Sequence, residues 1–519
     1  MTISPKFPLD QVHVIVVGGG AAGGVVAARL SEDPERNVLL IEAGPGFETP
    51  EDMPPVLRYG AYSEGVVTTR DFMWKYPTTP TAPGARGYEL LTGKALGGGS
   101  SVNGQVWLRG LPGDFDAWAG RGAAAWGWED VAPWFAATET DLDFPDGQVH
   151  GHDGPVVVRR FSRDEWHASH RAFHQACLDH GFEAVDDLNR PGASGVGAQP
   201  FNNHDGVRQG SAITHVLPAI ERPNLRVLAE TEVRTVLFEG TRAIGVEVRE
   251  AQGEIVRLAA SEEVILSAGA IGSPWLLMRS GIGAAEHLLA HGIGVVADLP
   301  GVGQNLQDHP RVGARWITGT GVLLDPTAAR YQVSLRTTAP GSAIPDDLKI
   351  SMTSFATDER GLGVELYVYL MLADSRGSVR LRSSDPAVPP EIDFRFFSAE
   401  EDLRRMREGV RLGLSIAASP LLQDLVVERV APVEADLADD GAFDAWLRRE
   451  VQGTFHPSST CAIGPADDPR SVVDDFGLVH GVQGLRVVDA SIMPDSVRAN
   501  LTATIFMLAE RIAARIRAN

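Results

Sequence analysis

Residues 13–30 read HVIVVGGGAAGGVVAARL, and this stretch decides the fold of the chain. The β-branched run His13–Val17 predicts a buried parallel strand, the glycines that follow a tight turn, and Val25–Leu30 a helix. A second buried run, Val38–Ile41, predicts another strand, and Glu42 follows it directly. The order of strand, glycine turn, helix, strand and acid is the order of a βαβ unit that binds a dinucleotide.

Each part of this unit has a physical reason to contact such a ligand. Glycines let the backbone approach a pyrophosphate, and the free N–H groups of a helix N-terminus attract it. A carboxylate at Glu42 is placed to accept hydrogen bonds from an adenosine ribose. A glycine turn that serves only helix–strand packing is the alternative, but that alternative does not explain Glu42. The pattern does not distinguish FAD from NAD.

The composition excludes several classes of protein. The 519 residues include 46 Lys+Arg and 68 Asp+Glu, and the formal net charge of −22 argues against nucleic acid or an anionic membrane as the main partner. Two cysteines, Cys177 and Cys461, form neither a disulfide framework nor a zinc motif. No apolar run reaches the roughly 18 residues of a membrane span, and the opening residues lack the apolar core of a signal peptide. We therefore expect a cytoplasmic protein without a metal site.

The rest of the chain predicts two kinds of sheet. Buried runs at 225–228, 233–238, 264–267 and 485–488 extend the α/β unit, with a helix expected from Trp275. Residues 314–430 differ, because Ile350–Phe355, Val364–Leu372 and Ser378–Arg382 predict an antiparallel sheet, followed by a helix at about Ala399–Ala418. The prediction is an α/β Rossmann-like cofactor domain that is interrupted by an α+β substrate domain.

Two further segments favour close contact with a ligand. Residues 93–107 read GKALGGGSSVNGQVW, and their three consecutive glycines let the backbone approach a flat or anionic group. A tight turn into a helix is an equally good interpretation of that segment. The proline-rich stretch at 45–83 is long for a linker, so we expect it to wrap a ligand or to cover a site.

Several segments together resemble the glucose–methanol–choline (GMC) family of flavin-dependent oxidoreductases. Gly93–Asp116 resembles the first signature of the family, and Gly269–Gly283 (GAIGSPWLLMRSGIG) resembles the second. Gly301–Pro310, Phe455–Gly464 and Val487–Pro494 also resemble family segments, in the order of the family. The resemblance covers essentially the whole chain. It implies FAD-binding segments at 1–155, 216–312 and 455–519, and substrate-domain segments at 156–215 and 313–454.

The resemblance also implies which residues hold the FAD. These residues would line the diphosphate, ribose, ribityl chain and flavin: Gly18, Gly20, Ala21, Ala22, Glu42, Ala43, Trp74, Gly99, Asn103, Gly104, Val106, Val233, Ala268, Asp489, Ala490 and Leu501. For Trp74, simple packing is an equally good interpretation. Some family members attach FAD through a histidine after the Ser-Ser pair, where this chain has Val102. We therefore expect non-covalent FAD.

By the same resemblance, His456 is the catalytic base or alkoxide-stabilising group and Asn500 orients the substrate oxygen. A neutral imidazole suits proton abstraction near pH 7. The plainer alternatives are a loop histidine at 456 and a helix cap at Asn500. His309 is expected to tie the domains together, and Cys461 to pack beside the site.

His167, His170 and His174 have helical spacing, which superficially suggests a metal-binding face. No acidic partner completes such a site, and we interpret the segment as a solvated or boundary helix.

The sequence does not identify a single substrate. The strands at 350–355 and 364–372, together with Phe455, predict a largely apolar pocket that suits an uncharged or aromatic primary alcohol better than a sugar. Thr502 stands where choline-type enzymes have a second asparagine, which weakens a choline dehydrogenase-like interpretation. A sugar oxidase and a redox-neutral cyanohydrin lyase stay as alternatives, while His456 with Asn500 argues against a decarboxylase. The electron acceptor, O2 or a quinone or another compound, and the oligomeric state are not predicted.

Overall fold

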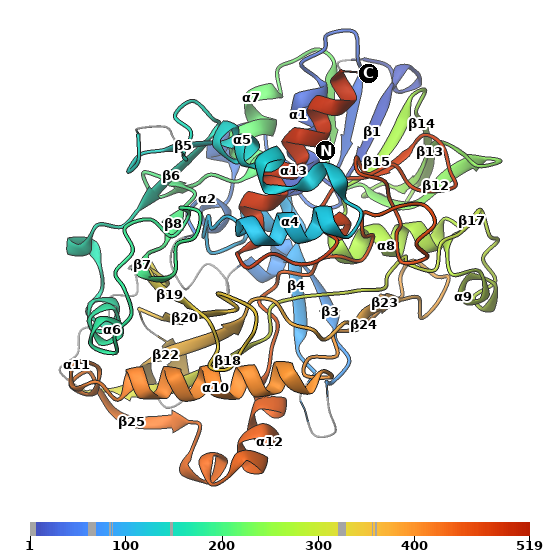
Figure 1. Ribbon diagram of the computed structural model, residues 1–519. Coiled ribbons are helices and arrows are strands. Elements are labelled where there is room, and N and C mark those ends of the chain that lie inside the picture. The colour runs from blue at the N-terminus through green and yellow to red at the C-terminus, as the bar shows by residue number, and fades with distance from the viewer. Residues whose placement is uncertain are drawn as a thin grey trace.

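The computed structural model describes residues 7–60, 69–81, 85, 87–145, 149–319, 329–354, 356–358 and 361–518. A five-stranded parallel sheet with the order β11-β2-β1-β15-β26 forms one half of the molecule (Figure 1). Its strands are β1 (Val14–Val17), β2 (Val38–Ile41), β11 (Leu225–Leu228), β15 (Glu263–Leu266) and β26 (Leu485–Val487). All five strands were predicted, and their order is that of a dinucleotide-binding sheet with its switch point beside β1.

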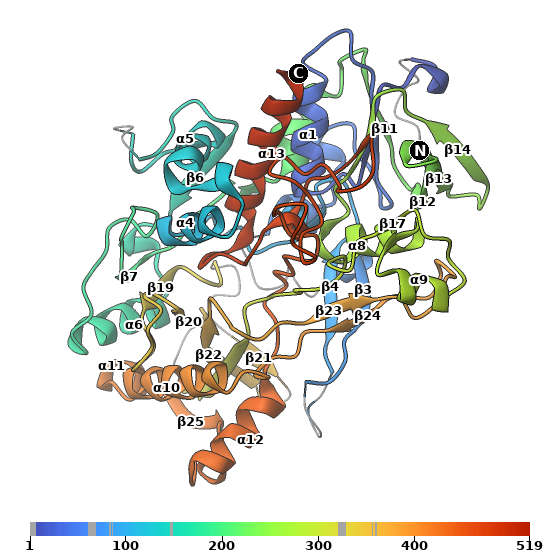
Figure 2. The ribbon, with the colours of Figure 1, turned by 45° about the vertical axis from the view of Figure 1, so that its right-hand side comes forward.

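The glycine turn after β1 packs too closely for side chains. Gly18 has a φ of +97°, and a Cβ at Gly23 would lie 2.0 Å from the carbonyl oxygen of Gly18. The turn leads into α1 (Ala21–Leu30), which lies beside the C-terminal helix α13 (Leu501–Arg517) in both views (Figures 1 and 2). The first α-helix of the chain, which lies on the parallel sheet, therefore packs against the last one.

Helix α8 (Gly269–Arg279) begins six residues earlier than the sequence predicted. Pro274 lies inside it and has no N–H to donate to the carbonyl of Ala270. The hydroxyl of Thr460 donates to that carbonyl instead, at 2.7 Å. A hydrogen bond from a distant segment therefore replaces the one that proline removes, and the sequence before Trp275 gave no sign of it.

A seven-stranded antiparallel sheet forms the other half of the molecule, and β21 pairs with its strand β22. The strands are β25 (Val426–Ala431), β18 (Arg311–Thr318), β22 (Gly361–Leu370), β20 (Leu348–Met352), β19 (Val333–Thr337), β7 (Gly195–Ala198) and β21 (Ala356–Asp358). Helix α10 (Glu400–Ala417) lies along one face of this sheet, as Figure 1 shows. The predicted strand at 350–355 ends at Met352, and Phe355 lies outside the described residues.

The predicted strand at 378–382 does not join this sheet. Strand β23 (Ser378–Arg380) pairs instead with β24 (Glu391–Asp393) in a separate ribbon.

The other strands are β3 (Met73–Pro77), β4 (Glu89–Gly93), β5 (Glu139–Asp141), β6 (Val156–Arg160), β8 (Pro200–Phe201), β9 (Asn203–His204), β10 (Val207–Arg208), β12 (Glu232–Glu239), β13 (Arg242–Arg249), β14 (Ile255–Ala259), β16 (Ile282–Gly283) and β17 (Ala297–Asp298). The other helices of four or more residues are α2 (Pro55–Arg58), α4 (Pro112–Gly120), α5 (Trp128–Thr138), α6 (Ala168–Asp179), α9 (Ala285–Ala290), α11 (Pro420–Gln423) and α12 (Asp440–Glu450), the π-helical turn η7 (Ala212–Val216) and the 3-10 turns η3 (Thr69–Phe72), η4 (Gly98–Ser101) and η8 (Glu434–Leu437). Shorter turns are η1 (Leu9–Gln11), η2 (Pro50–Asp52), η5 (Ala124–Trp126), η6 (Arg163–Glu165), α7 (Leu217–Ala219) and η9 (Ala490–Ile492).

The two sheets draw on alternating parts of the chain. The parallel sheet takes strands from residues 14–41, 225–266 and 485–487, whereas the antiparallel sheet takes strands from 195–198 and 311–431. We propose that the two domains are built from the five segments that the family resemblance implies. Among the described residues, every helix is too short or too polar to cross a bilayer.

Of the two predicted alternatives, a solvated or a boundary helix, the structure shows a boundary helix, and two of its histidines lie on the buried face. Helix α6 buries His170 completely, and His174 is only 7% exposed. His170 Nε2 lies 3.0 Å from Ser354 Oγ, so the ring has a polar partner in the interior. Spacing alone could not show that this face packs against the antiparallel sheet.

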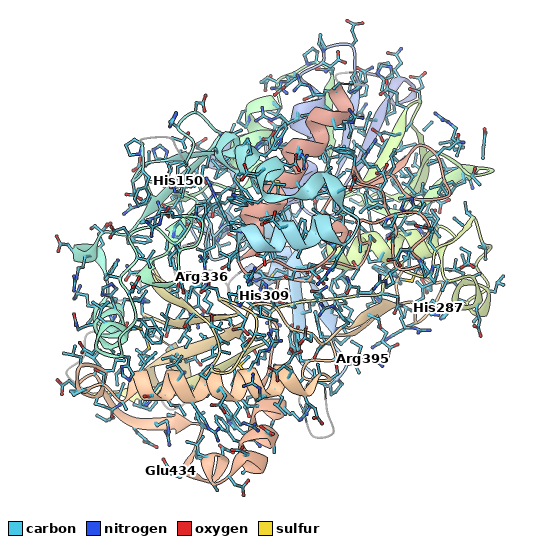
Figure 3. The ribbon with its side chains drawn as sticks, viewed as in Figure 1. His150, His287, His309, Arg336, Arg395 and Glu434 are labelled. Carbon is cyan, nitrogen blue, oxygen red and sulfur yellow. The ribbon has the colours of Figure 1, made fainter. Side chains whose placement is uncertain are left out.

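A buried ionic cluster near β5 and β6 lies away from the centre of the molecule (Figure 3). His150 Nδ1 lies 2.7 Å from Glu139 Oε1 and its Nε2 2.9 Å from Asp187 Oδ2, while Arg160 pairs with Asp141 at 2.9 Å. Burial opposes the imidazolium, but hydrogen bonds to Asp141, Asp187 and Glu139 outweigh it and raise the pKa of His150 to about 10. These carboxylates are therefore neutralised by side chains, which argues for a structural role.

Candidate active site

A cavity of about 450 Å³ lies between the parallel and the antiparallel sheet. One end is lined by the glycine turn after β1, and the other by β18, β20 and β22. Every residue that was predicted for the cofactor or for catalysis lines this cavity, and so does Phe455. The predicted strand 364–372 contributes Tyr367, Tyr369 and Met371, whereas no described residue of 350–355 lines the cavity. Segments as distant as Gly18 and Asn500 thus contribute to one site, whose volume is typical of ligand pockets.

The cofactor end has the shape of a cradle for a close-fitting ligand. A Cβ at Gly99 or Gly104 would meet nothing within 4 Å, so both backbones face open cavity space. At Gly18 and Gly98, by contrast, a Cβ would clash with the neighbouring backbone. Glycine therefore lies where the loop at Gly98 meets the turn after β1, and where the cavity requires space for a ligand. These residues fit an FAD.

Glu42 lies at this end of the cavity and is 5% exposed. Its carboxylate accepts hydrogen bonds from the backbone N–H groups of Gly19 at 2.9 Å and Gly44 at 2.8 Å. Burial nevertheless raises its pKa to about 7. A buried carboxylate that is held only by backbone donors keeps lone pairs for hydroxyl groups of a ligand, as a ribose contact needs.

Trp74 both lines the cavity and packs within the β3–β4 ribbon. The Lys94 ammonium lies 4.2 Å from the centre of its ring, and Tyr76 stacks on it at 6.3 Å. Strand β3 belongs to the proline-rich stretch, whose residues Pro77 and Pro80 are described while Pro83 lies outside the described residues. At Met73, Trp74 and Tyr76 this stretch does border the cavity.

At the opposite end, His456 and Asn500 face one another. Asn500 Nδ2 lies 3.3 Å from His456 Nε2. Asn500 occupies the N-cap position of helix α13, but its side chain forms no capping hydrogen bond and so does not cap the helix. The amide oxygen instead accepts a hydrogen bond from Lys349 Nζ at 3.0 Å, which turns the amide nitrogen toward the histidine.

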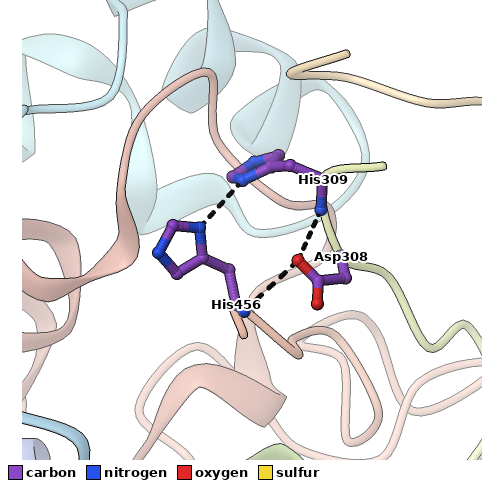
Figure 4. Close-up of side chains that lie close together, drawn as sticks. All are labelled: Asp308, His309 and His456. Atoms are coloured by element: carbon purple, nitrogen blue, oxygen red, sulfur yellow. Dashed lines mark hydrogen bonds between the residues drawn. The ribbon is translucent and has the colours of Figure 1, made fainter. Parts of the chain in front are cut away.

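His309 lies beside His456, with 3.1 Å between the two Nδ1 atoms (Figure 4). His309 Nε2 donates to the carbonyl of Val497 at 2.9 Å, so the neutral ring has a bare Nδ1. His456 Nδ1 therefore carries the proton that lies between the two rings. Thr454 Oγ1, 2.9 Å from the same nitrogen, is a second acceptor, because its own proton goes to Asp308 Oδ1 at 2.8 Å.

These partners assign the tautomer of His456. With Nδ1 protonated, Nε2 carries a lone pair that points into the cavity and accepts a hydrogen bond from Asn500 Nδ2 at 3.3 Å. The same loop is held by Asp308, whose Oδ1 accepts the backbone N–H groups of His309 at 2.7 Å and His456 at 3.2 Å (Figure 4). His309 and Thr454 thus orient the ring of His456 through its Nδ1 atom, while Asp308 holds its backbone.

The electrostatic surroundings keep this imidazole neutral. Burial first, and then His309, Lys349 and Arg311, hold the pKa of His456 well below its ordinary value. Burial also lowers the pKa of His309 to about 4. Both rings are neutral at pH 7, so His456 Nε2 is available as a proton acceptor.

The sequence missed a second set of cavity residues. These side chains are Arg311, Arg330, Tyr331 and Lys349. Tyr367 and Tyr369 also line the cavity, and they lie on the strand that was predicted at 364–372. The wall is therefore less apolar than predicted. Alternation along β22 was the available signal, because every second residue of a strand faces the same side. His309, predicted as a tie between domains, also lines the cavity, whereas Cys461 is fully buried.

Comparisons with known proteins agree with this geometry. The N-terminal family model of GMC oxidoreductases matches residues 12–311, and the C-terminal model matches residues 373–509. An oxygen-dependent choline dehydrogenase of Brucella melitensis is 36% identical, over 97% of this chain and 95% of the relative.

Solved structures are similar over nearly the full length. Pyridoxine 4-oxidase from Mesorbium loti superposes with a TM-score of 0.90 at 29% identity, covering 98% of this chain and 99% of that one. A fungal aryl-alcohol oxidase superposes with a TM-score of 0.84 at 26% identity, with the same coverage of both chains.

Proposed function

The chain belongs to the GMC oxidoreductase family, and from that premise we propose that it oxidises a primary alcohol to the aldehyde. One observation carries the proposal. His456 presents an unprotonated Nε2 to the cavity, beside the amide nitrogen of Asn500. FAD, when bound, supplies the acceptor for the hydride that leaves the carbinol carbon.

His456 is the proposed base. The hydroxyl proton of the alcohol moves to Nε2, while Nδ1–H stays hydrogen-bonded to His309 and Thr454. Asn500 is proposed to donate its amide N–H to the substrate oxygen and to stabilise the negative charge that develops there. Lys349 supports this role, because its hydrogen bond to the amide oxygen of Asn500 fixes the orientation of the amide group.

The aromatic residues of the cavity support an aromatic alcohol. Tyr331, Tyr367, Tyr369 and Phe455 line it, and planar rings of this kind favour a planar substrate. The similarity to a structure named aryl-alcohol oxidase supports the same choice.

Choline is a less favourable substrate, although choline dehydrogenases are among the relatives. Thr502, which stands where choline-type enzymes have a second asparagine, accepts a hydrogen bond from Asn103 Nδ2 at 3.1 Å. This position therefore contacts the proposed cofactor-binding loop and not the substrate. The positive charges of Arg311 and Lys349 line the cavity and would repel a trimethylammonium group.

The cofactor is proposed to be FAD without a covalent bond. Val102 lines the cavity after Ser100 and Ser101, and its side chain has no nucleophile. Acid precipitation should leave the flavin in the supernatant. Flavin that stays with the pellet would contradict this point.

The cofactor residues that the family resemblance implies, from Gly18 to Leu501, form the proposed FAD site. The electron acceptor is proposed to be O2 or another small acceptor. The two free thiols, Cys177 and Cys461, fit a reducing, cytoplasmic compartment, which cell fractionation would test.

The test is an anaerobic mixing experiment with the purified flavoprotein. Benzylic, furanic, aliphatic and sugar alcohols, choline and a cyanohydrin are added separately, and the visible absorbance of the flavin is followed. Bleaching by benzylic or furanic alcohols supports the proposal, and admitting air then separates an oxidase from a dehydrogenase. Cyanohydrin cleavage without bleaching by any alcohol would contradict it.

A further inference from the structure

Three positively charged side chains line the substrate end of the cavity. Arg311 begins β18, Lys349 lies on β20, and Arg330 precedes β19. Strands β18 and β20 both pair with β22, so the charges of Arg311 and Lys349 converge on Tyr367 and Tyr369 of that strand. The Arg311 guanidinium lies 4.7 Å from the ring centre of Tyr367, and the Lys349 ammonium lies 5.5 Å from that of Tyr369.

Lys349 and Arg311 form no ion pair within the part of the chain that the structure describes. Burial opposes the charge of Arg311, but the surrounding tyrosines and the more distant Glu365 outweigh it and raise the pKa of Arg311. Lys349 is 8% exposed, and its hydrogen bond goes to the neutral oxygen of Asn500. Arg311 reaches only the amide of Gln452, at 3.5 Å, and its buried Nε has no hydrogen-bond partner. Arg330 differs, because it lies 3.6 Å from a carboxylate oxygen of Glu365.

An uncompensated positive charge is costly in a partly closed cavity. Burial lowers the pKa of Lys349 to about 7, which measures that cost. Other buried cations of this chain have direct partners of two kinds: Arg160 pairs with Asp141 at 2.9 Å, whereas Arg208 and Arg336 donate to backbone carbonyl groups. A neutral alcohol would leave both charges of the cavity unpaired. A ligand with its own negative charge would satisfy them.

The form of the site favours a carboxylate on an aromatic ring. Arg311 is flanked by the rings of Tyr367 at 4.7 Å and Phe455 at 5.8 Å, so its planar fork is held between aromatic groups. A guanidinium fork matches the two oxygens of a carboxylate, and an ammonium adds a further donor. The surrounding tyrosines then contact the ring that carries the carboxylate.

We propose that the substrate is an aromatic primary alcohol that also carries a carboxylate, and that Arg311 and Lys349 bind this carboxylate. The inference rests on the proposed function, because it names the substrate class of the same site. It replaces the expectation of an uncharged substrate with an anionic one. The two cations that select this substrate lie outside the strands 350–355 and 364–372, to which the sequence had assigned an apolar wall.

The test compares two substrates of matched shape. The holoenzyme is mixed anaerobically with 4-(hydroxymethyl)benzoate or with its methyl ester, and kcat/KM for flavin reduction is measured. A charge-assisted hydrogen bond should make the carboxylate about 10- to 100-fold better than the ester. Arg311→Gln should reduce this ratio about 10-fold, and Arg311→Lys should restore part of it. Arg429→Gln, on β25 of the same sheet and outside the cavity, should keep the wild-type ratio.

Calorimetry gives a second readout that does not depend on turnover. The non-reacting anion 4-methylbenzoate should bind the holoenzyme at least about 10-fold more tightly than 4-methylbenzamide, and Arg311→Gln should abolish the difference. An ester that is reduced as fast as the acid, together with equal binding of the two ligands, would overturn the inference while alcohol oxidation stands. If no alcohol of either kind reduces the flavin but the anion still binds selectively, the proposed oxidation fails and the anion site stands.

Discussion

Replacing Lys349 by methionine removes a positive charge that acts on the imidazole of His456. The Lys349 ammonium donates to Asn500 Oδ1 at 3.0 Å, and Asn500 Nδ2 lies 3.3 Å from His456 Nε2. These two contacts in series place the ammonium about 8 Å from Nε2, where two unit charges interact by about 2 kcal/mol at an effective dielectric constant of about 20. That energy corresponds to about 1.5 pH units. The pKa of Lys349 is about 7, so the lysine is charged in the range where His456 titrates.

The expected result follows from the sign of this interaction. In the wild type, kcat/KM should persist well below pH 6.5, because the pKa of His456 is lowered and the base stays neutral. In Lys349→Met that pKa rises, so the acid limb of the profile should move upward by about 1 to 1.5 pH units. The assay is anaerobic flavin reduction by benzyl alcohol, a neutral substrate that does not need Lys349 for charge pairing.

Two control variants make this experiment specific. Lys349→Arg retains the charge and should keep the acid limb close to that of the wild type. Lys75→Met changes an exposed lysine on β3 and should leave the profile unchanged. An acid limb that stays in place in Lys349→Met, or that moves downward, would refute the electrostatic argument.

Three further predictions concern other parts of the molecule. Asn500→Ala should lower the rate of flavin reduction by benzyl alcohol about 100-fold, since one oxyanion donor is lost; a change of less than about threefold would argue against that role. Glu42→Gln should weaken FAD binding to the apoprotein about 10-fold, measured by fluorescence titration, because an amide offers one acceptor oxygen in place of two. His150→Gln should lower the free energy of unfolding by about 3 kcal/mol near pH 6, by denaturant titration. The folded-state pKa of His150 is raised to about 10, so its contribution is complete below about pH 6.5 and is lost as the pH rises through 10. The difference between variant and wild type should therefore shrink at alkaline pH, and a constant difference would count against the charged imidazole.

Local patterns in the sequence predicted the main elements of the fold. The run from His13 to Leu30 predicted β1, the glycine turn and α1, since strand and helix periodicities are local properties of a chain. The start of α8 was missed because the hydroxyl that replaces the hydrogen bond lost at Pro274 comes from Thr460, far away in sequence. Tertiary contacts of this kind leave no local pattern.

The candidate site likewise contains residues that the sequence predicted and residues that it did not. His456 and Asn500 were predicted from the resemblance to a family, and the structure places them 3.3 Å apart. Lys349 and Arg311 were missed, because a single cation in a strand has no meaning until the pairing of strands shows which residues share its face. The role of His309 beside His456 likewise depends on a contact between residues 147 positions apart.

The measurement that tests the central claim most directly is the rate of flavin reduction in His456→Gln. Glutamine keeps a polar side chain of similar reach but cannot accept the hydroxyl proton as imidazole does. Under anaerobic conditions with benzyl alcohol, we expect the limiting rate to fall about 100- to 10,000-fold relative to the wild type, with FAD still bound. His204→Gln, a change at an exposed histidine outside the cavity, should leave the rate unchanged. A rate within about threefold of the wild type in His456→Gln would contradict the assignment of His456 as the base.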